Sequence, residues 1–115
     1  NCLIYMPRND ISKWEFVEKG RTQKIKISGD IRCNSGDALR IASIQGCGVA
    51  QLPTYMIGLD IQAGRLEALL EDYEPEKQPI YAIYNDRKYL SAKIRTFIDF
   101  IYELYLPEPY WNEWT

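Results

Sequence analysis

The chain has 115 residues, 46% of them hydrophobic, and its 14 lysine and arginine residues against 16 aspartate and glutamate residues give a net charge of −2. This balance argues against direct binding of DNA or RNA by the segment, because phosphate contacts need a surplus of clustered cations. No apolar run reaches the roughly 18 residues of a membrane-spanning helix, and the lack of histidine, with three cysteines at unrelated spacings, argues against a metal site.

Three strands are expected before the first helix. Residues 3–6 form an apolar run that stops at a proline, which is typical of a short buried strand. Residues 14–17 predict a second strand, and Gly20 and Arg21 predict the turn after it. Between residues 24 and 31 polar and apolar side chains alternate, as in a strand with one exposed face.

A helix with clear start and stop signals comes next. We expect Asn34 to cap it, with Asp37 as an acidic partner in its positively polarised first turn. Gly46 is well placed to end it in a left-handed conformation. One stripe of this helix holds Ala38, Ile41, Ala42 and Gln45, with Leu39 beside it.

The middle of the chain predicts a strand, a helix and another strand. Residues 48–52 read as a short buried strand that ends at Pro53, and a helix is expected from about 54 to 62, ending near Gly64. Residues 66–70 predict a further strand.

The last third contains a loop, a β-prone run and an amphipathic helix. Residues 71–78 are acidic and contain proline, whereas residues 79–84 strongly favour a strand. Ser91 caps a predicted helix over 91–105, and the tail after it should be irregular. The helix places these apolar side chains at helical spacing: Ile94, Phe97, Ile98, Ile101, Tyr102 and Tyr105.

The alternation of strands and helices predicts an α/β fold with a mixed or largely parallel sheet. In such sheets ligands bind at the carboxyl ends of strands, near helix N-termini. This rule selects the two expected strand-to-helix junctions as candidate ligand contacts, namely Asn34, Ser35 and Gly36 at the first and Pro53 and Thr54 at the second. Helix capping alone would also explain the polar residues at the first junction.

Several motifs together carry a family resemblance. The strongest lies within residues 29–53, where a helix ends at Gly46 and leads into Gly48-Val49-Ala50 and then Leu52-Pro53. It is followed by Gly64-Arg65-Leu66, Tyr81-Ala82-Ile83-Tyr84, Leu90-Ser91 with residues 94–100, and Pro109-Tyr110-Trp111. As a set these motifs resemble the effector-binding domain of LysR-type transcription regulators over nearly the whole chain. The stretch 8–20 departs from the pattern, since many members have a helix there.

The resemblance implies a partial two-lobed domain of the type 2 periplasmic-binding-protein kind, with Rossmann-like halves joined by crossover strands. On this mapping, residues 3–6 and 79–84 are the crossover strands and residues 7–78 form the second lobe. Residues 91–105 are a helix of the first lobe, and residues 106–115 are its tail. The chain does not begin with methionine, and we expect it to be part of a longer protein whose DNA-binding domain lies outside it.

The resemblance also implies partners. A small-molecule effector, expected to be a metabolite, would occupy the cleft between the lobes, and the protein would form a homo-oligomer in the cytoplasm. DNA would be bound only through the separate N-terminal domain, with no role for a membrane. Pro7, Arg8 and Asn9 follow the first crossover strand, so Arg8 could pair with a carboxylate of the effector, although a loop arginine in solvent is the commoner case.

Two other classes of function fit this sequence less well. An enzyme is not expected, because the sequence has no histidine, no nucleophile elbow and no phosphate-binding loop, and no cofactor is expected either. A lobe of a solute-binding protein from a transport system shares the architecture, but its secretion would disfavour unpaired cysteines.

The apolar stripe of the helix 91–105 also leads to a prediction. A contiguous apolar surface left in water favours association, so we expect the chain by itself to associate with a second copy.

Overall fold

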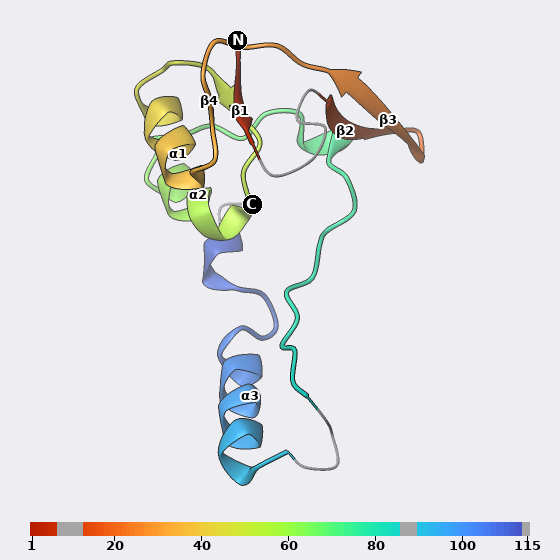
Figure 1. The fold of residues 1–115 in the computed structure, drawn as a ribbon, viewed down its shortest axis with the longest axis vertical. Coiled ribbons are helices and arrows are strands. Elements are labelled where there is room, and N and C mark those ends of the chain that lie inside the picture. Colours follow the sequence, from red (N-terminus) through yellow and green to blue (C-terminus); the bar gives the residue numbers. More distant parts are fainter. Residues whose placement is uncertain (7–12, 86–89, 114–115) are drawn as a thin grey trace.

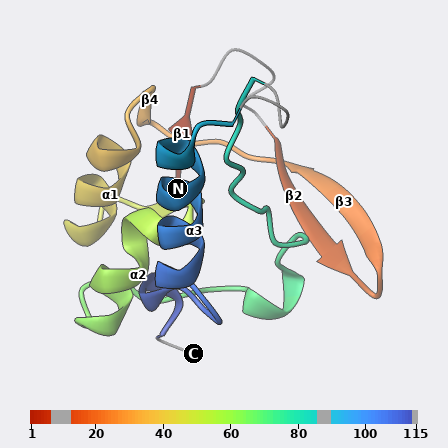
Figure 2. The ribbon, with the colours of Figure 1, turned by 90° about the horizontal axis from the view of Figure 1, so that it is seen from below.

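The computed structural model describes residues 1–6, 13–85 and 90–113. A three-stranded parallel sheet lies at the centre of its N-terminal part (Figure 1). Strand β1 (Cys2–Tyr5) lies between β4 (Arg32–Cys33) and β5 (Val49–Ala50), with Ile4 paired to Arg32 and Leu3 to Ala50. The helices α1 (Gly36–Ile44) and α2 (Thr54–Gln62) lie together on one side of these strands in both views (Figures 1 and 2). We call these three strands and two helices the α/β part.

The core of the α/β part is small. Leu3 and Ile4 of β1 and Leu39 of α1 are almost fully buried, and Ile27 is buried beside them. Within the predicted stripe of α1, Ile41 is more than half exposed, so the core-facing residue is Leu39, which the sequence placed beside the stripe. The predicted α/β class is confirmed by this arrangement.

Two close backbone approaches hold β1 in place. A Cβ atom on Gly29 would lie 1.7 Å from the carbonyl oxygen of Cys2, and one on Gly48 would lie 2.3 Å from that of Asn1. Both neighbours are backbone atoms, which cannot rotate away as a side chain can. Only glycine therefore allows the chain to pass so near β1 on either side.

A separate antiparallel hairpin consists of β2 (Lys13–Glu18) and β3 (Arg21–Lys26). Lys19 and Gly20 connect the strands, and both have positive φ. A two-residue type I′ turn requires this conformation at both positions, and its geometry matches the right-handed twist of the two strands. The predicted strand over 24–31 is wrong in its position, since this turn sets the register and β3 begins three residues earlier than predicted. A mixed sheet was also expected, but the described strands of opposite direction belong to two different sheets.

The helix boundaries agree well with the sequence. α2 spans the predicted residues 54–62, and Gly64 after it has a φ of +67°. α1 ends as expected at Gly46, where the N–H of Gly46 donates to Ser43 and that of Cys47 to Ala42. Its predicted cap is wrong by one residue, because the side chain of Ser35, not Asn34, accepts from Ala38 N at 3.3 Å.

Two predicted strands are absent from the described chain. Residues 66–70 form no strand, since no described strand pairs with them; Leu70, with a φ of +60°, leads into the short 3-10 helix η1 (Glu71–Tyr73). Residues 79–84 are irregular, and no described strand pairs with them. Their assignment as a crossover strand, like the lobe assignments, stays a prediction.

The helix α3 (Ala92–Leu104) stands apart from the α/β part (Figure 1). Its start is confirmed, since the Ser91 side chain accepts from Ile94 N at 3.3 Å. Within the described residues α3 packs against no other helix or strand. We call residues 79–84 and α3 together the arm. After it the chain returns, and the 3-10 helix η3 (Tyr110–Asn112) packs against α2, where Gln62 donates to the Tyr110 carbonyl at 2.8 Å.

Candidate ligand-binding site

The carboxyl ends of the three parallel strands meet at one edge of the sheet. There β4 leads through Asn34 and Ser35 into α1, and β5 leads through Pro53 into α2. β1 reaches the same edge, where Met6 N donates to the Cys33 carbonyl at 2.8 Å. Both strand-to-helix junctions selected from the sequence therefore lie at a single edge.

The two junctions are in contact with one another. A Cβ atom on Gly36, the first residue of α1, would lie 2.6 Å from Met56 Cε and 3.8 Å from Leu52 Cδ2. Met56 belongs to the first turn of α2 and Leu52 precedes that helix. The structure thus brings the N-termini of α1 and α2 side by side, which the sequence alone only suggested.

At the N-terminus of α1, capping uses some of the polar groups and leaves others free. The Ser35 hydroxyl accepts from Ala38 N, and its carbonyl accepts from Leu39 N at 3.2 Å. The backbone N–H groups of Gly36 and Asp37 donate to no acceptor within the described residues. Capping fully explains the Ser35 side chain, whereas Asn34 is exposed and has no partner in the part of the chain that the structure describes.

The N-terminus of α2 has no side-chain cap. Its N-cap residue is Pro53, and the first internal bond runs from Met56 N to the Pro53 carbonyl at 3.0 Å. Among the described residues, no acceptor receives the N–H groups of Thr54 and Tyr55. Two neighbouring helix N-termini, each with unused donors, favour an anionic or strongly polar ligand over an apolar one.

One charge at this edge opposes an anion. Asp37 lies in the first turn of α1, where its carboxylate already interacts favourably with the helix dipole. An anionic ligand would therefore be drawn toward the α2 side, whose first turn contains no acidic residue. Pro7, Arg8 and Asn9, the third predicted group of contacts, lie outside the described residues.

A buried ion cluster behind the site was not found from the sequence. Asp60 of α2 is fully buried, and its carboxylate binds Arg40 of α1 and Arg65 after α2. Arg40 makes two bonds, one through Nε and one from Nη2 to Oδ1 at 3.0 Å, while Arg65 Nε donates to Oδ1 at 2.7 Å. The available signal was a single acidic residue within the apolar run Tyr55 to Ile61, because a charge on a buried face needs a partner.

This cluster has a clear electrostatic consequence. The hydrogen bond from Arg40 is the main reason that the pKa of Asp60 lies below its usual value, although burial acts in the opposite direction and Arg65 adds a smaller effect. The same bond raises the pKa of Arg40 further. Asp60 thus stays ionised, and its ion pair with Arg40 joins α2 to α1. This contact helps to hold the two helix N-termini at their shared edge.

Comparisons with a family model and with known proteins point to the same family. The family model described as the LysR substrate binding domain matches residues 1–105. The chain is 30% identical over 103 residues to the HTH-type transcriptional regulator CrgA of Neisseria meningitidis, covering 89% of the chain and 34% of that protein. It is 31% identical over 94 residues to an uncharacterized HTH-type transcriptional regulator of Haemophilus influenzae, covering 82% of the chain and 33% of that protein.

A shorter relative also matches. The putative LysR family substrate binding domain-containing protein YagP of Escherichia coli is 28% identical over 91 residues, which cover 79% of the chain and 67% of that protein. The chain spans about a third of the length of the two regulators. No solved structure matches the chain, and no helix in the described residues has the length and apolar character to cross a membrane.

Proposed function

We propose, from the premise that the chain belongs to the LysR substrate-binding domain family, that it senses a small-molecule effector on behalf of a bacterial transcription regulator. Family membership rests on a match that covers 105 of the 115 residues. Two of the three relatives named above are described as HTH-type transcriptional regulators, which favours this function over an enzyme and over a lobe of a transport protein.

Since the chain spans about a third of those regulators, DNA binding would belong to a segment outside residues 1–115. The balanced charge of the chain supports this division, because it offers no surplus of cations to phosphates. A cytoplasmic location and a homo-oligomeric parent protein are part of the same proposal.

The effector contacts are proposed at the edge where α1 and α2 begin. The observation that carries this is the contact between Gly36 and Met56, which sets two helix N-termini with unused N–H donors side by side. Such donors bind a carboxylate or phosphate without a charged side chain. Asn34, Ser35, Pro53 and Thr54 would line the effector, and Arg8, which lies outside the described residues, would add a cation.

The test is a titration of the isotope-labelled chain with small carboxylates, each paired with its neutral amide, followed by backbone NMR. Amide shifts of residues 35–37 and 54–56 on addition of the carboxylates, and not of the amides, would support the site. The expected affinity is weak, about 1–10 mM, because few groups contact the ligand. Shifts that lie elsewhere, or none at all, would contradict the proposed contacts.

A matched pair of variants isolates the backbone donor. Thr54→Pro removes one N–H at the first position of α2, where proline is tolerated without loss of the helix. Thr54→Val removes only the hydroxyl and keeps that N–H. We expect Thr54→Pro to weaken carboxylate binding roughly five-fold, whereas Thr54→Val should bind as the unchanged chain does.

A further inference from the structure

The ion cluster between α1 and α2 has one cation more than it has anions. Arg40 and Arg65 both bind Asp60, and no second carboxylate of the described residues forms an ion pair with either arginine. The hydrogen bond to Asp60 is the largest influence that raises the pKa of Arg40, and Asp37, three residues earlier on α1, is the smallest. Two positive charges thus share one buried negative charge, and one positive charge is left without a close partner.

The two guanidinium groups of this cluster lie next to one another. Arg40 Nη2 is 3.0 Å from Asp60 Oδ1, and Arg65 Nη2 is 2.6 Å from the same oxygen. Since both nitrogens contact one atom, a single small molecule can reach both guanidinium groups. Like charges at such a distance repel each other, and the one carboxylate compensates only one of them. A further anion is therefore attracted to this place.

Both arginines have hydrogen-bond donors that Asp60 does not use. A guanidinium group carries its five N–H donors in a planar fork, and each of these two turns its Nε and Nη2 toward Asp60. In the part of the chain that the structure describes, their Nη1 groups donate to no acceptor. The side chains of Arg40 and Arg65 are 31% and 50% exposed, so a ligand can reach these donors from solvent.

The positions of both arginines are fixed before a ligand arrives. Arg40 lies in the middle of α1, and Arg65 follows α2, where its backbone N–H donates to the Asp60 carbonyl at 2.8 Å. Gly64, with a φ of +67°, makes the turn that brings Arg65 back to this carbonyl. An arginine that a carboxylate already holds loses little side-chain freedom on binding an anion, which lowers the entropic cost of binding.

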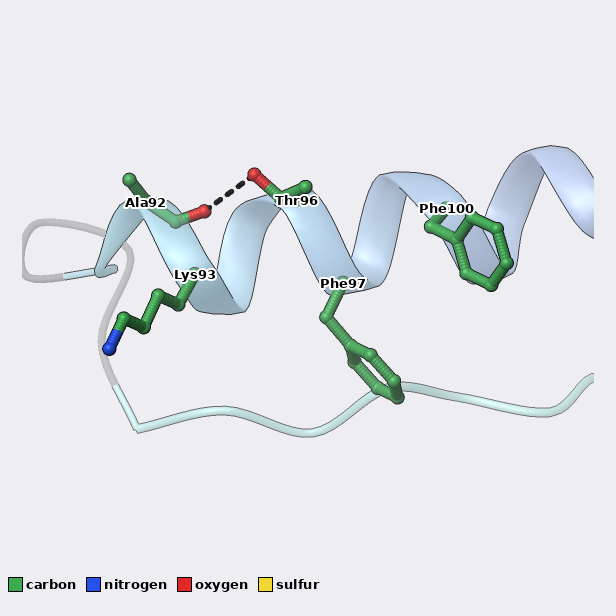
Figure 3. A pocket seen from close by; sticks show the side chains of 5 residues that line it. All are labelled: Ala92, Lys93, Thr96, Phe97 and Phe100. Atoms are coloured by element: carbon green, nitrogen blue, oxygen red, sulfur yellow. Dashed lines mark hydrogen bonds between the residues drawn. The ribbon is translucent and has the colours of Figure 1, made fainter.

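Lys93 of α3 shows the opposite case. It lines an apolar hollow together with Ala92, Thr96, Phe97 and Phe100 (Figure 3). Among the described residues no carboxylate forms an ion pair with Lys93, and the Thr96 hydroxyl already donates to the Ala92 carbonyl at 2.8 Å. A single lysine that nothing holds offers an anion neither a fixed direction nor a second cation. Lys93 therefore provides a control for the arginine pair.

We propose that Arg40 and Arg65 form a binding site for a phosphate group. Arginine forks match phosphate oxygens in bidentate pairs. The oxygens of a tetrahedral phosphate point in several directions, so one phosphate accepts from both guanidinium groups. A planar carboxylate pairs best with a single fork and binds here more weakly. Inorganic phosphate and a small phosphate monoester both present this chemistry.

The phosphate site is distinct from the carboxylate contacts proposed at the helix N-termini. Asp60 lies about 9 Å along α2 from Thr54, near the opposite end of that helix. The phosphate site uses guanidinium side chains, whereas the contacts at the sheet edge use backbone N–H groups. It does not depend on the effector-sensing function, so either proposal can fail without the other.

The test is a titration of the isotope-labelled chain with inorganic phosphate, followed by the NMR signals of the arginine Nε–H groups. Sodium chloride keeps the ionic strength constant, so that general screening is not counted as binding. We expect saturable shifts of Arg40 and Arg65 with a dissociation constant of about 1–10 mM, because the site is open to water. No saturable shift up to about 50 mM phosphate, or shifts confined to the amides of residues 35–37 and 54–56, would overturn the proposal.

Three variants separate the arginine pair from a general loss of charge. Arg65→Gln should weaken phosphate binding at least about ten-fold, and Arg65→Lys, which keeps the charge but loses the fork, about five-fold. Lys93→Gln removes a cation elsewhere and should bind phosphate as the unchanged chain does. Binding that Arg65→Gln leaves unchanged, or that all three variants weaken equally, would contradict the site. The amide spectrum of each variant shows whether α1 and α2 are folded, and Arg65→Lys decides if Arg65→Gln does not fold.

A second titration, with glycerol phosphate, identifies the source of the phosphate group. Tighter binding than that of inorganic phosphate would show that the site takes a phosphorylated small molecule. Equal or weaker binding would show that it takes free phosphate. Either result supports the site only if the same two Nε–H signals shift, and a shift of other arginine signals alone would count against it.

Discussion

Residues 3–6 and residues 79–84 have the same kind of sequence and very different surroundings. Both are short apolar runs rich in β-branched and aromatic residues, and both predict a strand. The first becomes β1, shifted by one residue to Cys2–Tyr5 and paired on both sides, with Ile4 only 1% exposed. The second stays irregular, and Ile83 is 95% exposed. A strand is thus a property of a pair of segments, and β-propensity shows only that a segment would accept a partner.

The helices repeat this contrast. α1 and α3 both begin at a serine whose side chain accepts from the N–H three residues later. α1 packs against β1, β4, β5 and α2, whereas α3 packs against no described helix or strand. The cap determines where a helix begins, while packing determines how much stability that helix adds to the molecule. The comparison between the α/β part and the arm can be tested with matched substitutions.

The largest difference is expected for the two isoleucines. Ile4→Ala should lower the free energy of unfolding by about 2–5 kcal/mol, because it opens a cavity beneath β1. Ile83→Ala should change it by less than about 0.5 kcal/mol, because that side chain lies in water. Urea denaturation followed by far-UV circular dichroism measures both. Equal effects would show that the arm is packed in solution and would remove the contrast between the two regions.

A smaller effect is expected at the ion cluster that joins α1 to α2. Asp60→Asn keeps the shape of the side chain but removes its charge, so the hydrogen bonds from Arg40 and Arg65 weaken. The expected loss is about 2 kcal/mol in the free energy of unfolding. Asp72→Asn, at an exposed carboxylate in η1, is the control and should have little effect.

The same variant carries a pH prediction. The folded state holds the pKa of Asp60 below the value of 3.8 for a free side chain. The stability that this carboxylate contributes is therefore complete above the unfolded pKa and is lost as the pH falls through the lower, folded pKa. The stability difference between the unchanged chain and Asp60→Asn should be constant above about pH 5 and should shrink below about pH 4. A difference that grows on acidification would contradict the direction of the pKa change.

The smallest effects separate the two helix caps. Ser35→Ala should lower the free energy of unfolding of the α/β part by about 1 kcal/mol, since a capped helix is part of that core. Ser91→Ala should leave the urea midpoint of the α/β part unchanged and lower only the helix content of α3, which backbone NMR shifts of residues 92–96 report. A matching loss of midpoint in both variants would mean that α3 unfolds together with the core.

The sequence by itself determined the local features of this protein. Gly46, Gly64 and Ser91 predicted helix ends correctly, because the left-handed backbone and the side-chain cap depend on single residues. The LysR resemblance also came from the sequence, and the family comparison confirms it. The two strand-to-helix junctions were selected correctly as neighbours of the sheet edge, since every parallel strand of an α/β fold ends there.

Only the tertiary structure decided what depends on distant partners. Residues 79–84 lack a strand because nothing in the described chain pairs with them, and β3 is shifted because the turn at Lys19 and Gly20 sets its register. The single acid in the apolar run of α2 indicates that Asp60 needs a partner, but its bond to Arg40, 20 residues away, exists only because α1 packs against α2. Helix caps and turns depend on the backbone conformation of a few neighbouring residues. Burial, strand pairing and ion pairs instead depend on residues that are distant in the sequence and come into contact only in the folded chain.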